Sequence, residues 1–173
     1  FDVSRFTKLQ HLGGDYWNGL INLDKAYSLT SLVICKYPFP NLVQFSALRN
    51  LEVLHIYGSK IQNLDGVEKL SIRELSLARN NKLDDIHKIN EVSSLENLEI
   101  ECCKKLLDFS FLKDNSYIED LFIDKLDSID FVDSMPNLKK INFWNCKDGN
   151  MTPLLKSKSL KDVNFYPNKR HYT

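Results

Sequence analysis

The chain has 173 residues, of which 43% are hydrophobic and 11% aromatic, and its 23 Lys and Arg residues balance its 23 Asp and Glu residues. This length fits one domain with a sizeable core, and the many aromatic residues without a charge excess argue against disorder. A net charge of zero excludes the globally basic composition of most nucleic-acid binders. No apolar run is long enough to span a bilayer. We therefore expect one globular domain that binds neither nucleic acid nor a membrane.

A leucine-rich motif recurs along the whole chain. Its spacing, L-x-x-L-x-L, defines three apolar positions, which we number 1, 4 and 6 of each repeat. A weak first copy begins at position 9, and the starts at 9, 29, 51, 72, 95, 118, 138 and 160 are separated by 20 to 23 residues. Seven phased copies predict a repeat architecture. They are Leu29–Leu32–Ile34, Leu51–Leu54–Ile56, Ile72–Leu75–Leu77, Leu95–Leu98–Ile100, Ile118–Leu121–Ile123, Leu138–Ile141–Phe143 and Leu160–Val163–Phe165.

The segments between the motifs have a different period. Their apolar residues recur at every third position, which suits a 3₁₀ turn or a short irregular helix better than a long amphipathic helix. We expect each repeat to supply one short strand to a parallel sheet, with positions 1, 4 and 6 in the core and the residues between them facing outward. Residues 1–173 are then a single solenoid, and its first repeat is truncated because Phe1, Val3 and Phe6 match only the second half of a repeat.

The motif resembles that of the leucine-rich repeat family, whose period is about 20–29 residues. The short repeats are similar to bacterial types, including internalin-like repeats and small immunity proteins, and so is the tail from Phe165 to Tyr172. The resemblance implies an α/β solenoid of about eight repeats, with a parallel β-sheet on the concave face and 3₁₀ or irregular segments on the convex face. It also implies a non-enzymatic protein-binding module.

The four cysteines and four histidines follow no disulfide or metal spacing. Cys103 and Cys146 occupy position 9, where the family carries Asn or Cys to satisfy backbone groups. They lie two repeats apart, roughly 10 Å, which exceeds the ~7 Å limit between the Cα atoms of a disulfide. Four free thiols favour a reducing compartment, so we expect a cytoplasmic protein without metal or cofactor. Cys35 and His55 are the only candidate nucleophile and base, and we interpret them as incidental neighbours.

The outward positions 2, 3, 5 and 7 carry more acids than bases. The acids are Asp15, Glu52, Glu74, Glu96, Glu99, Glu101, Glu119, Asp120, Asp124 and Asp162, and the bases are Arg73, Lys139, Lys140 and Lys161, an excess of 10 − 4 = 6 negative charges. Exposed aromatic residues, which are enriched in binding hot spots, share this face. We therefore predict a partner-binding site made of His55, Tyr57, Glu74, Glu99, Glu101, Asp120, Phe122, Asp124, Trp144 and Tyr166.

An acidic face with aromatic anchors favours a basic protein partner. Our first hypothesis is an immunity protein that binds and neutralises a basic, nuclease-like bacterial toxin. The alternatives are an internalin-like surface protein that binds a host receptor and an intracellular regulatory scaffold. None of the three requires a small-molecule substrate.

Overall fold

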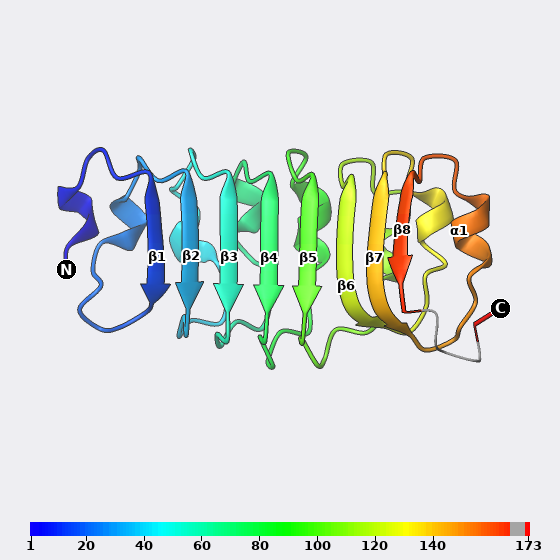
Figure 1. Cartoon of the computed structure of the whole chain (residues 1–173). Coiled ribbons are helices and arrows are strands. Elements are labelled where there is room, and N and C mark those ends of the chain that lie inside the picture. Colours follow the sequence, from blue (N-terminus) through cyan, green and yellow to red (C-terminus); the bar gives the residue numbers. More distant parts are fainter. Residues whose placement is uncertain (167–171) are drawn as a thin grey trace.

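The chain forms one parallel sheet of eight strands in a computed structural model that describes residues 1–166 and 172–173 (Figure 1). The strands are ordered along the sheet as they are along the chain, so each one pairs with its neighbours in sequence. Residues 167–171 of the tail, for which we noted a similarity to bacterial repeat proteins, lie outside the described residues. The strands are β1 (His11–Asp15), β2 (Ser31–Cys35), β3 (Val53–Tyr57), β4 (Glu74–Ala78), β5 (Asn97–Glu101), β6 (Asp120–Leu126), β7 (Lys140–Cys146) and β8 (Asp162–Phe165).

Short helical segments precede the strands; in the view of Figure 1 those of the middle repeats lie behind the sheet, and η1 and α1 lie beyond its two ends. Most span a single 3₁₀ turn, as the three-residue apolar spacing predicted. We call the opposite, uncovered side of the sheet the open face; it corresponds to the predicted concave face. The segments are η1 (Val3–Arg5), η2 (Leu23–Lys25), η3 (Val43–Phe45), η4 (Val67–Lys69), η5 (His87–Glu91), η6 (Ser110–Leu112), η7 (Val132–Ser134) and α1 (Thr152–Lys156).

The strand register confirms the predicted phase of the repeats. At position 4, Leu32 pairs with Leu54 and Leu54 with Leu75, and all three are fully buried. The predicted burial of positions 1, 4 and 6 is wrong only at the ends of the sheet, where Val163 is 37% exposed and Leu12 only partly buried. Each lies on a strand that has a single strand neighbour, so half of its packing surface is uncovered by the described sheet.

A left-handed residue at position 8 ends the strands of four consecutive repeats. Lys36, Gly58, Arg79 and Cys102, which follow β2 to β5, have φ values between 54° and 58°. The left-handed conformation at position 8 changes the direction of the chain, so that the next side chain, at position 9, points into the core. In the two following repeats this conformation is missing, and β6 and β7 continue for seven residues each.

The side chain at position 9 forms hydrogen bonds with backbone groups of the preceding repeat in several of the repeats. Asn80 accepts a hydrogen bond from the Ser59 N–H at 2.9 Å and donates one to the Ile56 carbonyl at 2.8 Å. The role predicted for Cys103 is confirmed, because its Sγ lies 3.4 Å from a carbonyl oxygen of β4. Cys146 bonds within its own turn: its thiol donates to the Asp148 carboxylate at 3.1 Å, and the backbone N–H groups of Asp148 and Gly149 hydrogen-bond to its sulfur.

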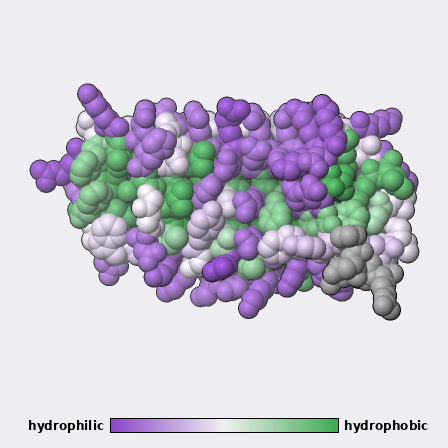
Figure 2. All heavy atoms as spheres, viewed as in Figure 1, coloured by the Kyte–Doolittle hydropathy of each residue, from purple (hydrophilic) through white to green (hydrophobic). Residues whose placement is uncertain are grey.

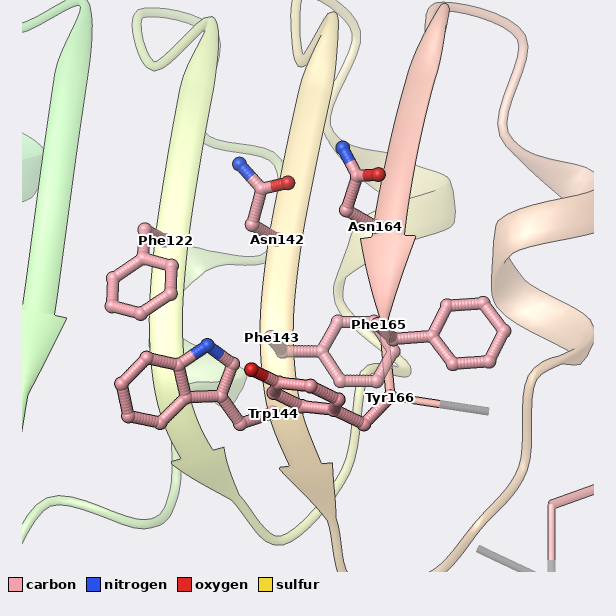
Figure 3. A pocket seen from close by; sticks show the side chains of 7 residues that line it. All are labelled: Phe122, Asn142, Phe143, Trp144, Asn164, Phe165 and Tyr166. Atoms are coloured by element: carbon pink, nitrogen blue, oxygen red, sulfur yellow. The ribbon is translucent and has the colours of Figure 1, made fainter. Parts of the chain in front are cut away.

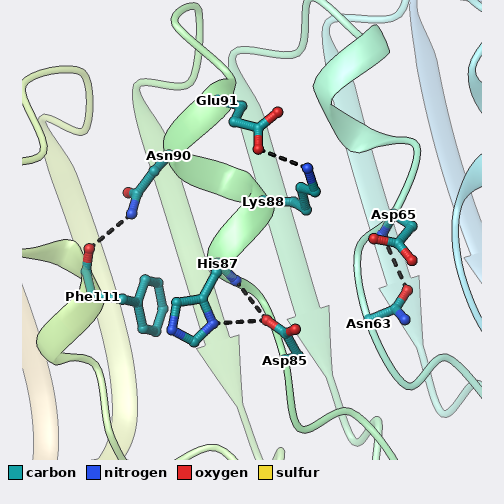
Figure 4. A network of polar contacts seen from close by, with 8 residues as sticks. All are labelled: Asn63, Asp65, Asp85, His87, Lys88, Asn90, Glu91 and Phe111. Atoms are coloured by element: carbon teal, nitrogen blue, oxygen red, sulfur yellow. Dashed lines mark hydrogen bonds and ion pairs between the residues drawn. The ribbon is translucent and has the colours of Figure 1, made fainter.

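Turns closed by a side-chain oxygen precede two of the helical segments behind the sheet (Figure 4). Asn63 Oδ1 accepts the N–H of the residue two positions on, at 3.1 Å. In the next repeat, Asp85 Oδ1 accepts both the backbone N–H and the Nδ1 proton of His87, at 3.0 and 2.8 Å. These hydrogen bonds lower the pKa of Asp85. The ring centroids of His87 and Phe111 lie 4.5 Å apart, so this turn also contacts the following repeat.

Candidate functional site

Three rows of side chains cross the open face at positions 3, 5 and 7 of the repeats. Hydrophilic residues crowd the edge of this face where the strands begin (Figure 2). Neighbouring residues of a row lie about 4.8 Å apart, so a ligand can contact several at once. The register places one row, at position 5 of β3 to β8, in the order His55, Ser76, Glu99, Phe122, Asn142 and Asn164.

Ion pairs between neighbouring repeats compensate much of the predicted acidic excess. Glu119 pairs with Lys139 at 2.6 Å, and Asp120 pairs with Lys140 at 3.0 Å. Similar pairs join Arg73 to Glu96 and Lys36 to Asp15. These pairs are exposed, so each contributes little to stability, but they cancel charge locally. The sequence predicted the charges of this face and not their pairing.

Two acids on β5 retain uncompensated charge. Among the described residues, neither Glu99 nor Glu101 has an ion-pair partner. Glu99 is exposed at position 5, and Glu101 is half-buried at position 7 of the same strand. Burial raises the pKa of the adjacent Cys102 thiol, and the charges of Asp124 and Glu101 raise it further. β5 therefore carries two acids of the open face without an ion-pair partner among the described residues.

Asp124 does not belong to the exposed surface to which it was assigned. It is only 5% exposed, and its Oδ2 accepts the Cys102 backbone N–H at 3.0 Å. β6 continues past this position, and Asp124 lies between two residues that pair with β7 while having no pairing partner of its own. Its carboxylate therefore satisfies the backbone turn at the end of β5, which is a structural role.

His55 lies in a chain of hydrogen bonds on β3 and β4. Its Nε2 lies 2.6 Å from Glu74 Oε1, and its Nδ1 lies 3.1 Å from the Tyr57 hydroxyl. Ser76 donates to that hydroxyl at 3.4 Å. Cys35, the candidate nucleophile, pairs in register with Tyr57 and is outside this chain. The structure thus groups three predicted site residues, His55, Tyr57 and Glu74, in one polar cluster.

Five aromatic residues line a hollow of about 390 Å³ at the β8 end of the open face: Phe143 and Phe165, and the three contacting rings of Phe122, Trp144 and Tyr166. The ring centroids of Phe122 and Trp144 lie 5.4 Å apart and those of Trp144 and Tyr166 lie 6.3 Å apart, in tilted, edge-to-face contacts. Figure 3 shows the Trp144 indole between the other two rings, with Asn142 and Asn164 nearby. Trp144 is 41% and Tyr166 55% exposed. We call this site the aromatic hollow.

A second hollow, of about 300 Å³, adjoins the first. It shares Phe122 and Asn142 with the aromatic hollow and is lined by polar residues that include Glu99, Asp120 and Lys140. An aromatic and an acidic compartment are therefore continuous across β4 to β8.

The two asparagines of the aromatic hollow were not among the predicted site residues. Asn142 and Asn164 occupy position 5 of their repeats, so the repeat phase alone placed them on the open face. The prediction omitted them because it rested on charged and aromatic side chains only. Asn164 Nδ2 donates to Asp162 at 2.9 Å, which orients the amide and leaves its carbonyl oxygen as an acceptor for a ligand.

No metal centre or membrane segment emerges from the described part of the chain. Residues 1–166 and 172–173 contain no group of three or more His, Cys, Asp or Glu side chains placed to hold a metal ion. Within the same residues, no helix is long and apolar enough to cross a membrane.

Comparison with solved structures identifies the fold. A search of family models and a search of curated protein sequences gave no match. Internalin C2 from Listeria monocytogenes str. 4b F2365 superposes with a TM-score of 0.55 at 15% identity, covering 92% of this chain and 77% of that one. The fold is a leucine-rich repeat solenoid. The structure of PEPR1-AtPEP1 aligns with 95% of this chain and 32% of its own, at 15% identity and a TM-score of 0.31, which is too low to bear on the fold.

The leucine-rich repeat core predicts a graded reactivity of the four cysteine thiols. Burial raises the pKa of Cys103 to about 11 and that of Cys146 to about 12, whereas Cys35 and Cys102 are partly exposed. Because the thiolate is the reactive form, we expect a disulfide reagent at pH ~8 to modify Cys35 first and Cys102 more slowly. Cys103 and Cys146 react only in denaturant. Mass spectrometry of the modified peptides measures the order, and rapid native modification of Cys103 would contradict this packing.

Proposed function

We propose that this leucine-rich repeat protein is a non-enzymatic binding module that captures a basic protein partner on its open face. The observation that carries the proposal is the continuity of the two hollows, one lined by exposed aromatic rings and the other by acids. Exposed aromatic residues supply burial when a partner covers them, and the uncompensated charges of Glu99 and Glu101 attract a basic surface. A non-catalytic role agrees with the hydrogen-bonded cluster of His55, Glu74 and Tyr57, which excludes Cys35.

The finer proposal is an immunity protein that neutralises a cationic, nuclease-like toxin in the cytoplasm. A nuclease must present a basic surface to its nucleic acid, and an acidic binding face can cover that surface. The reduced cysteines are consistent with a reducing compartment. The similarity to internalin C2 favours a second candidate, a surface protein that binds a receptor, because that neighbour has the same fold.

Inhibition of a cationic nuclease domain tests the first candidate. The purified chain is titrated against such domains, starting with any that is encoded beside its own gene, and nuclease activity is measured. We expect stoichiometric inhibition, weakened when NaCl rises from about 0.05 to about 0.3 M because the contact is partly electrostatic. The variant Glu99→Lys/Glu101→Lys should weaken inhibition roughly 100-fold or more, since like charges then oppose each other.

The matched control reverses two carboxylates behind the sheet. Asp130 and Asp133 are exposed beside η7, so Asp130→Lys/Asp133→Lys changes the net charge equally but leaves the open face intact. This variant should inhibit as the parent does. Equal losses in both double variants would show that only net charge matters, and the proposed face would then be wrong.

A further inference from the structure

We propose that the aromatic hollow is an arginine subsite, which receives the guanidinium group and aliphatic stem of one arginine side chain from the partner. This inference rests on the proposed function and adds the chemistry of the central contact. We take the occupant to be a single side chain, and a volume of about 390 Å³ is large enough to receive a long one.

The aromatic rings of the hollow present their faces to a ligand and do not enclose an apolar cavity. Phe122 and Trp144 are inclined at 73°, and Trp144 and Tyr166 at 61°, so their faces point in different directions around the hollow. A cation over the face of an aromatic ring is attracted by its quadrupole, most strongly with Trp. Trp144 is the central ring of the three (Figure 3). An apolar side chain would gain burial here but would not use this attraction.

The charges next to the rings favour a cation. Phe122 pairs in register with Glu99 on one side and with Asn142 on the other. Glu99 has no ion-pair partner among the described residues, and it lies one strand, about 4.8 Å, from Phe122, with which it lines the adjoining hollow. A guanidinium group on the Phe122 side of the aromatic hollow would therefore lie next to an acid that has no ion-pair partner of its own. This charge complementarity selects a basic side chain as the occupant.

The asparagines distinguish arginine from lysine. Asn142 and Asn164 line the hollow side by side, and their side-chain carbonyl oxygens accept hydrogen bonds. A guanidinium carries five N–H donors in one plane, so it can stack on an indole and bond to an amide at the same time. An ammonium group is compact and strongly hydrated, so it loses more water for fewer contacts. A leucine or phenylalanine side chain would leave the amide oxygens unpaired.

Short peptides test the subsite without a protein partner. Four blocked pentapeptides with the same glycine flanks carry arginine, lysine, citrulline or leucine at the centre. Citrulline keeps the shape of arginine and removes the charge. Binding is followed by NMR through the indole N–H signals, with Trp17 at the far end of the chain as an internal reference. We expect the arginine peptide to shift the Trp144 signal and to bind roughly tenfold more tightly than the citrulline and leucine peptides.

Variants of Trp144 complete the test. Trp144→Ala should lower the affinity for the arginine peptide roughly tenfold, whereas Trp144→Phe keeps a ring face and should retain most of it. Trp17→Ala is the matched control and should bind as the parent does, because Trp17 is exposed elsewhere. Equal affinity for the leucine and arginine peptides, or a shift of Trp17 in place of Trp144, would overturn the subsite.

The outcomes separate this inference from the proposed function. If the arginine peptide binds at Trp144 and no cationic nuclease is inhibited, the subsite stands and the proposed function is wrong. If inhibition is lost in Glu99→Lys/Glu101→Lys but unchanged in Trp144→Ala, the proposed function stands and the subsite is wrong.

Discussion

Replacing Gly66 with alanine is expected to lower the free energy of unfolding by about 2–5 kcal/mol. Gly66 begins η4 with φ = 99°, where an L side chain is strained. An alanine Cβ would lie 2.6 Å from the Val43 nitrogen and 2.7 Å from the Leu42 carbonyl carbon. Both are backbone atoms of the preceding repeat and cannot rotate away, so the stacking of the two repeats must change. Urea denaturation followed by circular dichroism measures the loss.

Gly58→Ala is the matched control for this substitution. Gly58 also has a positive φ, 57°, but no atom lies within 4 Å of the Cβ that alanine would add. Gly58→Ala isolates the cost of placing an L residue in the left-handed conformation, which is about 1–2 kcal/mol. If the two variants unfold at the same urea concentration, the close approach between repeats at Gly66 does not exist in solution.

Asn80→Ala is expected to lower the free energy of unfolding by about 2–5 kcal/mol, through a different mechanism. Asn80 is fully buried and bonds both the Ser59 N–H and the Ile56 carbonyl. Alanine leaves these two backbone groups buried without a partner, and each lost partner costs about 1–3 kcal/mol. Because stability in a solenoid passes between neighbouring repeats, the loss should also speed amide hydrogen exchange in β3 and β4.

The neighbouring residue provides the control. Asn81 is exposed, so Asn81→Ala removes the same side chain without uncovering a buried group. Its free energy of unfolding should remain within about 0.5 kcal/mol of the parent value. A stability for Asn80→Ala equal to that of Asn81→Ala would show that water satisfies the two backbone groups and that the position 9 bond is dispensable.

The repeat phase made most of the fold predictable. A strand of period 2 and a turn of period 3 alternate, and each repeat packs mainly against its immediate neighbours. The position of Leu54 in the motif was therefore sufficient to assign its partners, Leu32 and Leu75. The motif position does not predict the burial of Val163, because a terminal strand has no neighbour on its outer side among the described residues.

The candidate site was only partly predictable. The phase placed Phe122, Trp144 and Tyr166 on one face, and the structure brings these three rings into contact. It also placed Asp124 there, whereas the structure buries that carboxylate against the Cys102 N–H. The failure arose because β6 departs from the position 8 turn that ends β5, a change of backbone path that the motif letters do not record.

The sequence by itself determined the repeat number, the strand order and, away from the sheet ends and Asp124, which side chains are buried and which face outward, because those properties depend on local period and nearest-neighbour stacking. Only the tertiary structure decided which acids are paired, that Glu99 and Glu101 are left uncompensated among the described residues, and that Asn142 and Asn164 share a hollow with the aromatic rings. Those properties depend on side-chain conformations and on contacts between residues about 20 positions apart, which the period of the repeat does not specify.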